Sequence, residues 1–366
     1  MRNVSNASLE AFFYLLRGGL WEKRADLPDC FPLSAEQWAD VYRLAQQQTV
    51  RGLVFRGICM LPESAMPADA LLARWTACAD AIERQNTVMN RALADLYRWF
   101  VEGGLQPVVL KGQGMARLYE YPLLRECGDI DFYFPRPTDR LQAERMLQQA
   151  GIRMEMHADG STNYVWQGVP VEHHSLGYDL RGGAVRRFLQ QMEQQHGFHE
   201  ITLLPGQGKP SICIPAPGLN FVLLNAHILK HTLGRGIGLR QLCDLARCSA
   251  RLSFTTDQEE LRRVCRLAGI SRWTSLLQSF MVEYLGLPER KLPLAYRRVD
   301  SRSLLQRILR GGNFGQYRAG ADRPAGRWAG KVRTAVCFLQ NIGFALRYAP
   351  HEAMYIFMQL SKGQLK

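Results

Sequence analysis

The sequence predicts an α/β (α+β) protein, in which a small mixed sheet is flanked by an N-terminal and a C-terminal helical region. Segments towards both ends of the chain carry apolar residues at the spacing of amphipathic helices. Between them, short β-type runs alternate with glycine turns and short helical segments. The chain has 366 residues, more than one hydrophobic core usually serves. We therefore divide it into residues 1–104, 105–215 and 216–366.

The composition is that of a folded protein without stable membrane insertion. Apolar residues make up 47% of the chain and charged residues 22%, which argues against disorder. A run of roughly 18 apolar residues, as a membrane span needs, is absent. Residues 1–10 lack the basic start and apolar centre of a signal peptide, so we expect a cytoplasmic location. Nine cysteines without a Cys-x-x-Cys pair predict buried free thiols rather than a zinc site.

The first region predicts helices. Residues 8–22 have helical spacing after a candidate cap at Ser8. Ser34 and Gln37 have the spacing of a capping box, which opens a second helix. Residues 68–102 contain no proline and predict one long helix that ends at two glycines.

The middle region predicts strands joined by turns and short helices. Asp-Gly and Gln-Gly turns separate its last three apolar runs, which are therefore expected to form an antiparallel meander. The predicted strands are residues 107–110, 130–134, 152–157, 163–167 and 169–175. The predicted helices are residues 114–121 and 138–150.

Two aspartates on the second predicted strand are candidate metal ligands. Side chains alternate along a strand, so Asp129 and Asp131 share a face, with their Cα atoms about 6.6 to 6.8 Å apart. Carboxylates placed in this way can share one or two Mg²⁺ ions. The alternative is that both aspartates form the solvent face of a half-buried strand.

A lysine–glycine turn before this strand favours the metal hypothesis. Backbone N–H groups from Gly112 onward, at a helix N-terminus, can receive a phosphate, and Lys111 adds a positive charge. A third carboxylate is expected on a neighbouring strand for metal binding and general-base work. Glu172 is the candidate, and the alternative is an exposed strand glutamate.

These residues resemble a known family. Residues 110–112, Leu118-Tyr119, Pro122, Arg125 and 128–131 look like the motif of the bacterial "uncharacterised nucleotidyltransferase" group of the polymerase-β-like superfamily. Glu172-His173 falls where that group places an acidic residue followed by histidine, and His227 and Asp244 resemble its later helical signature. The resemblance implies a nucleotidyltransferase core that transfers a nucleoside monophosphate from an NTP such as ATP, with Mg²⁺ (or Mn²⁺) as cofactor.

The resemblance also assigns site residues. It implies that Asp129, Asp131 and Glu172 are the catalytic and metal-binding residues. The candidate nucleotide-binding residues are Lys111, Gly112, Gln113, Arg125 and His227. Gln113 stands where the superfamily usually has a phosphate-binding serine. Arg125 has two open roles, contact with phosphate or an ion pair with an aspartate, whereas Arg240 and Asp244 are expected to pair with each other on one helix.

The last region predicts helices and carries most of the positive charge. The expected helices are residues 220–233, 239–252, 256–268 and 271–284, followed by a helical remainder with a basic interruption at 310–320. From residue 285 to the end, 15 lysines and arginines against 4 acidic residues contribute +11 to the net charge of +13. Phe314 and Tyr317 lie in the interruption, so nucleic-acid binding by charge and stacking is an alternative.

Two functions therefore follow from the sequence. The leading prediction is a Mg²⁺-dependent nucleotidyltransferase. Its hydroxyl acceptor is a small molecule, a protein or an RNA end, and the sequence does not distinguish among these. The alternative is a catalytically weak protein of the same fold, which binds nucleic acid or a protein partner through its basic C-terminal helical region.

Overall fold

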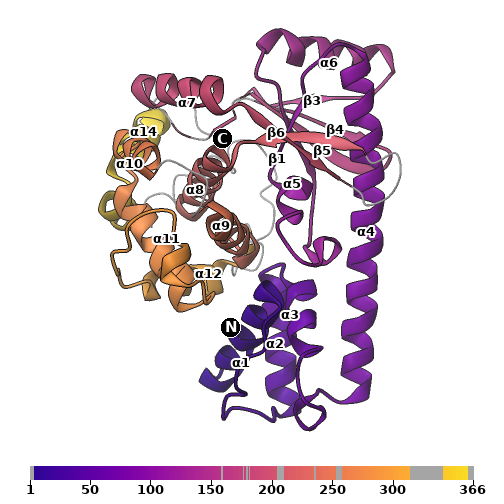
Figure 1. Cartoon of the computed structure of the whole chain (residues 1–366), viewed down its shortest axis with the longest axis vertical. Coiled ribbons are helices and arrows are strands. Elements are labelled where there is room, and N and C mark those ends of the chain that lie inside the picture. The colour runs from indigo at the N-terminus through magenta and orange to yellow at the C-terminus, as the bar shows by residue number, and fades with distance from the viewer. Residues whose placement is uncertain are drawn as a thin grey trace.

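One long helix lies along the molecule and joins the N-terminal helices to a sheet. The computed structural model describes residues 4–157, 160–175, 177–178, 180, 182–203, 210–234, 236–252, 258–313 and 341–361, with side chains up to residue 355. Helix α4 (Asp69–Glu102) runs from the N-terminal helices to the sheet. The C-terminal helices lie across from α4, to the left in Figure 1. The prediction of one unbroken helix over this segment is confirmed.

The N-terminal helices begin where local capping groups allow. Helix α2 (Ala35–Gln47) opens with the predicted capping box between Ser34 and Gln37. Helix α1 (Asn6–Trp21) is capped by Ser5, whose hydroxyl accepts from the Ser8 amide at 3.0 Å, so the prediction of Ser8 as the cap was wrong. Ser8 is instead fully buried, one turn inside the helix. Helix α3 (Arg51–Ile58) packs on α1.

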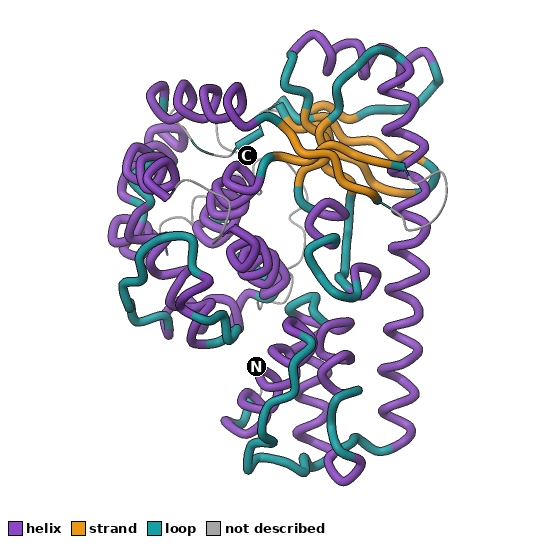
Figure 2. Tube along the Cα trace, in the orientation of Figure 1, coloured by secondary structure: helices purple, strands orange, loops and turns teal. Residues whose placement is uncertain are grey.

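A five-stranded mixed sheet forms the middle of the chain (Figure 2). Its strands are β1 (Val108–Leu110), β2 (Ile130–Tyr133), β3 (Glu155–Met156), β4 (Thr162–Trp166) and β5 (Val169–His174). They are ordered β1-β2-β5-β4-β3, and only the β2–β5 pair among them is parallel. The predicted α/β class and the predicted meander of the last three strands are therefore confirmed.

The connections differ from the prediction in position and number. Helix α5 (Gly112–Ala116) starts two residues earlier than predicted, because Lys111 and Gly112 turn the chain after β1 with positive φ angles of 50° and 42°, and it ends at Ala116 rather than at residue 121. A 3-10 turn, η2 (Pro122–Leu124), and helix α6 (Pro137–Gln149) follow. Helix α7 (Gly183–His196) and the hairpin of β6 (Phe198–Thr202) and β7 (Ser211–Pro215) were not predicted, and β7 lies against β1.

The two faces of the sheet have different partners. Ile130, Phe132, Val171 and His173 lie on the face that packs against α4 and α6, where the core includes Phe100. The opposite face carries Asp131 and Glu172, which are directly paired across β2 and β5. Ile130 and Phe132, which flank Asp131 along β2, are 1% and 0% exposed.

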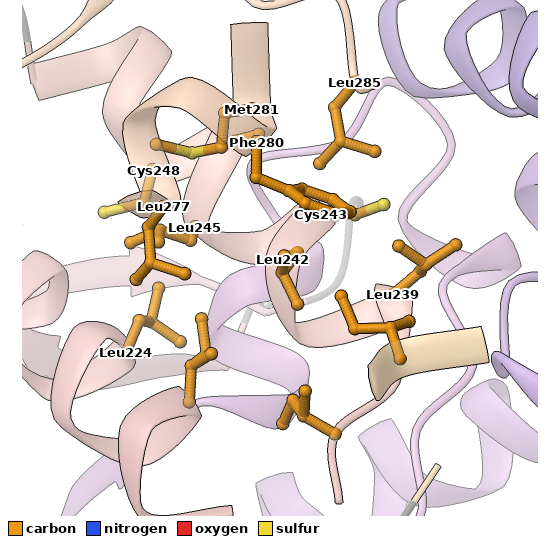
Figure 3. Packing of buried hydrophobic residues seen from close by; sticks show 14 of the residues in the cluster. Leu224, Leu239, Leu242, Cys243, Leu245, Cys248, Leu277, Phe280, Met281 and Leu285 are labelled. Atoms are coloured by element: carbon orange, nitrogen blue, oxygen red, sulfur yellow. The ribbon is translucent and has the colours of Figure 1, made fainter. Parts of the chain in front are cut away.

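The helices at the two ends of the chain share one hydrophobic core. Its C-terminal part is built by α8 (Pro217–Leu233), α9 (Leu239–Leu252), α10 (Gln258–Leu267) and α11 (Ser271–Glu283). Figure 3 shows the packing of side chains from α8, α9 and α11, including Leu242, Phe280 and the free thiols of Cys243 and Cys248. Trp21 at the end of α1 donates a 2.6 Å hydrogen bond to the carbonyl of Leu285, which ties the two groups together.

The remainder is less helical than predicted. Apart from η3 (Glu289–Lys291), residues 286–300 form no helix, because Pro288 and Pro293 interrupt the pattern. Helices α12 (Arg302–Gly311) and α14 (Pro350–Ser361) follow. Phe314 and Tyr317 of the predicted basic interruption lie outside the described residues. Within the described part of the chain, every helix is too short or too polar to cross a membrane.

Candidate functional site

A row of polar side chains crosses the open face of the sheet. Asp131 on β2 pairs with Glu172 on β5, and Glu172 pairs with Asn163 on β4. Paired residues in a sheet direct their side chains to the same face. The side-chain oxygen of Asn163 is buried and has no hydrogen-bond partner. The row therefore offers carboxylate and amide oxygens side by side.

His174 joins this row from the end of β5. Its Nε2 atom lies 2.6 Å from Oδ1 of Asp131, and its Nδ1 atom lies 3.9 Å from Oε1 of Glu172. Asp131, Glu172 and His174 each offer a ligand atom within 4.8 Å of the other two, a spacing that can hold one metal ion. Among the described residues, no other group of three or more His, Cys, Asp or Glu side chains has its ligand atoms this close together.

The turn after β1 brings a cation to the same carboxylate. The ammonium of Lys111 lies 3.3 Å from Oδ1 of Asp131, and the Lys111 side chain is only 14% exposed. Lys111 holds a backbone conformation (φ 50°, ψ −140°) that side chains rarely adopt, directly before the first turn of α5. The turn thus places a positive charge and the first N–H groups of a helix beside the acidic row.

These neighbours separate the acidities of the two aspartates. Burial alone would raise the pKa of Asp131, but Lys111 and the hydrogen bond from His174 hold that pKa well below its usual range. The charge of Asp131, followed by burial, raises the pKa of Asp129 to about 6. Asp129 directly precedes β2. The residue is exposed to solvent, but nearby protein atoms still contribute to the rise of its pKa. It lies beside the cluster of three ligands rather than within it.

The C-terminal helices add two further side chains to the surroundings of the aspartates. His227 on α8 helps to keep the pKa of Asp131 low, after the larger effects of Lys111 and His174. Arg240, at the start of α9, lowers the pKa of Asp129 against the larger effect of Asp131. The Arg240 guanidinium donates a 2.8 Å hydrogen bond to the carbonyl of Glu126, while its Nε atom is buried without a hydrogen-bond partner.

Comparison with known proteins identifies the family. The profile of a protein family described as "Uncharacterised nucleotidyltransferase" matches residues 34–286, more than half of the chain. The chain belongs to this nucleotidyltransferase family. No curated protein matches it. A solved structure, an antigenic nucleotidyltransferase-like protein from Paracoccidioides brasiliensis, is similar at 13% identity with a TM-score of 0.31, over 57% of this chain and 94% of that one.

Two of the predicted nucleotide-binding side chains in this nucleotidyltransferase have other partners. The amide of Gln113 is buried, donates to Asn86 at 3.3 Å and accepts from Cys127 at 3.3 Å. Its side chain therefore faces the interior, and only its backbone N–H group remains on the α5 turn.

Arg125 is held by a buried aspartate. Its guanidinium makes two hydrogen bonds of 2.7 and 2.6 Å to Asp244 on α9, and the Tyr119 hydroxyl donates to the same carboxylate at 2.7 Å. Of the two roles open for Arg125, the structure shows the ion pair. The expectation that Asp244 pairs with Arg240 was wrong, because Asp244 points towards η2 and Arg240 points towards Glu126.

Sequence reasoning missed His174 and Arg240 as members of the site. The strand period of two carried the signal for His174, since it lies two residues after Glu172 on the same face. Its neighbour His173 faces the core instead, where it is 0% exposed and bonded to the Tyr164 hydroxyl at 2.8 Å. Arg240 carried no local signal, because its place depends on how α9 packs against the sheet region.

Proposed function

We propose that this nucleotidyltransferase transfers a nucleoside monophosphate from an NTP to a hydroxyl acceptor, with a divalent metal held by Asp131 and Glu172. The observation that carries the proposal is the convergence of two carboxylates, one imidazole and Lys111 at one point of the sheet face. Family membership supports an NTP substrate. The hydroxyl acceptor and the cytoplasmic location stay predictions.

The donor set fits a divalent cation. Carboxylate oxygens are the ligands that Mg²⁺ and Mn²⁺ prefer, and the orphaned oxygen of Asn163 adjoins them. Asp129, the third carboxylate of the predicted set, lies on the solvent side and would complete a second position. When bound, the metal would neutralise charge on the triphosphate and orient its α-phosphate.

The surrounding residues then have separate tasks. Lys111, Gly112 and the first N–H groups of α5 would hold phosphate oxygens, and Arg240 and His227 would assist them. The acceptor hydroxyl would attack the α-phosphorus in line, and the bond to pyrophosphate would break. Glu172, a member of the cluster that is only half-buried, would accept the hydroxyl proton.

The test is transfer of label from each α-³²P-NTP in the presence of Mg²⁺ or Mn²⁺, with a cell extract as the source of acceptor. Asp131→Asn and Glu172→Gln should each lower transfer by at least about 100-fold, a loss typical for a group that stabilises transition-state charge. Glu289→Gln, on the exposed η3 turn, is the matched control and should keep full activity. Transfer that survives both site substitutions would reject the proposal.

The division of labour along the chain is part of the same proposal. Residues 105–215 would form the catalytic core, while residues 1–104 and 216–366 would position it and supply Arg240 and His227. The shared core of the two helical regions supports a single rigid frame behind the site.

A further inference from the structure

The cluster on the sheet face contains an imidazole where a purely magnesium-binding site would need another oxygen. Mg²⁺ demands oxygen ligands in near-ideal octahedral geometry, whereas imidazole suits transition metals. Nε2 of His174 already points at the carboxylate that the metal would share, 2.6 Å from Oδ1 of Asp131. Glu172 lies on the other side of the same ring.

We propose that His174 is a nitrogen ligand of the metal and that the site therefore selects Mn²⁺ over Mg²⁺. The inference rests on the proposed function, because it concerns the metal of the same site. Two carboxylates and phosphate oxygens favour a hard cation, and one imidazole moves that preference towards the first-row transition metals. Mn²⁺ takes carboxylate and phosphate oxygens as Mg²⁺ does and, as a first-row transition metal, also accepts an imidazole nitrogen.

The present distances need only a small adjustment to admit the ion. Two neighbouring ligands of an octahedral metal, each about 2.1 Å from it, lie about 3.0 Å apart. The Nε2 to Oδ1 distance of 2.6 Å would therefore open by a few tenths of an ångström. Lys111, 3.3 Å from the same oxygen, would turn from Asp131 towards the phosphates of the NTP. Nε2 of His174, which donates its proton to Asp131 in this structure, would release that proton on binding the metal.

Electron paramagnetic resonance of Mn²⁺ bound to the full chain tests this directly. Electron spin echo modulation reports a ¹⁴N nucleus only when nitrogen is bound to the ion or lies very close to it. The variants are His174→Gln and, as the matched control, His199→Gln, which replaces an exposed histidine on β6. Circular dichroism spectra and melting temperatures of the three proteins establish that each is folded.

The inference expects ¹⁴N modulation in the wild type and in His199→Gln, and none in His174→Gln. The Kd for Mn²⁺ should rise at least about tenfold in His174→Gln, with a smaller rise for Mg²⁺. Mn²⁺ bound without ¹⁴N modulation, or an unchanged ratio of the two affinities, would overturn it and leave the proposed function standing. Absence of any metal-dependent NTP binding in the wild type would overturn both, and that outcome is read separately by calorimetry with an NTP analogue.

Discussion

Replacement of Asp244 by asparagine removes the charge that holds Arg125 in place. The Arg125 and Asp244 side chains are 5% and 2% exposed, and they make two hydrogen bonds with each other. Burial opposes the charged form of Arg125, but Asp244 and its hydrogen bonds keep the arginine pKa well above its usual value. Asparagine has nearly the same shape, so the change acts through charge.

The expected cost follows from leaving one buried charge without its partner. Such losses destabilise proteins by about 3–5 kcal/mol. At about 2 °C per kcal/mol for a large domain, the melting temperature of Asp244→Asn should fall by roughly 6–10 °C. Arg125→Met combined with Asp244→Leu should recover most of this loss, because apolar side chains of similar volume replace the pair without desolvated charge.

Thermal unfolding followed by tryptophan fluorescence measures the effect. The control is Asp300→Asn, which breaks an ion pair with Arg302 whose side chains are 58% and 76% exposed, and it should melt as the wild type does. An unchanged melting temperature for Asp244→Asn would refute the structural role.

Three further outcomes are expected. Lys111→Gly removes the ammonium, and glycine accepts the positive φ of 50°. The Kd for an NTP analogue should therefore rise at least about tenfold, which corresponds to about 1.4 kcal/mol of binding free energy. Unchanged affinity by calorimetry would contradict the proposed role of Lys111. Arg240→Gln should weaken the same binding several-fold without a change in fold, and wild-type affinity would exclude Arg240 from the phosphate site. Burial lowers the pKa of His173 to about 3, below an unfolded value near 6.5, so the unfolded chain binds the proton more tightly and stability falls as the pH drops through 6.5 towards 3. Between pH 7 and pH 5 the wild type should lose about 2 kcal/mol more than His173→Gln, and parallel urea-unfolding curves for the two proteins would count against this explanation.

Some features of the site were predictable because their causes are local. Alternation along a strand places Ile130 and Phe132 on the buried face and Asp131 on the other, whatever the neighbouring strands are. The capping box at Ser34 and the unbroken pattern of residues 69–102 likewise depend only on residues a few positions apart. The glycine and lysine after β1 marked a sharp turn, which their positive φ angles account for.

Other features depend on pairings between distant segments. The parallel register of β2 and β5 is what sets Glu172 beside Asp131, and a shift by one residue would have set His173 there instead. The same register directs the His174 side chain towards the candidate site, whereas the family resemblance pointed to His173. The sequence contains no local signal for a register between strands that lie some 40 residues apart in the chain.

Local sequence was sufficient to identify the parts of the candidate site: a lysine–glycine turn, two aspartates at the start of a strand and a later acidic strand, within a helical frame. Tertiary structure alone decided which of these side chains meet and which are used elsewhere. Asp244 and Arg125, from segments more than 100 residues apart, neutralise each other in the core, which leaves Lys111 and Arg240 as the cations beside the carboxylates. The physical reason is that a buried charge must find its partner in space, and the helices that bring those partners together are placed by a hydrophobic core drawn from both ends of the chain.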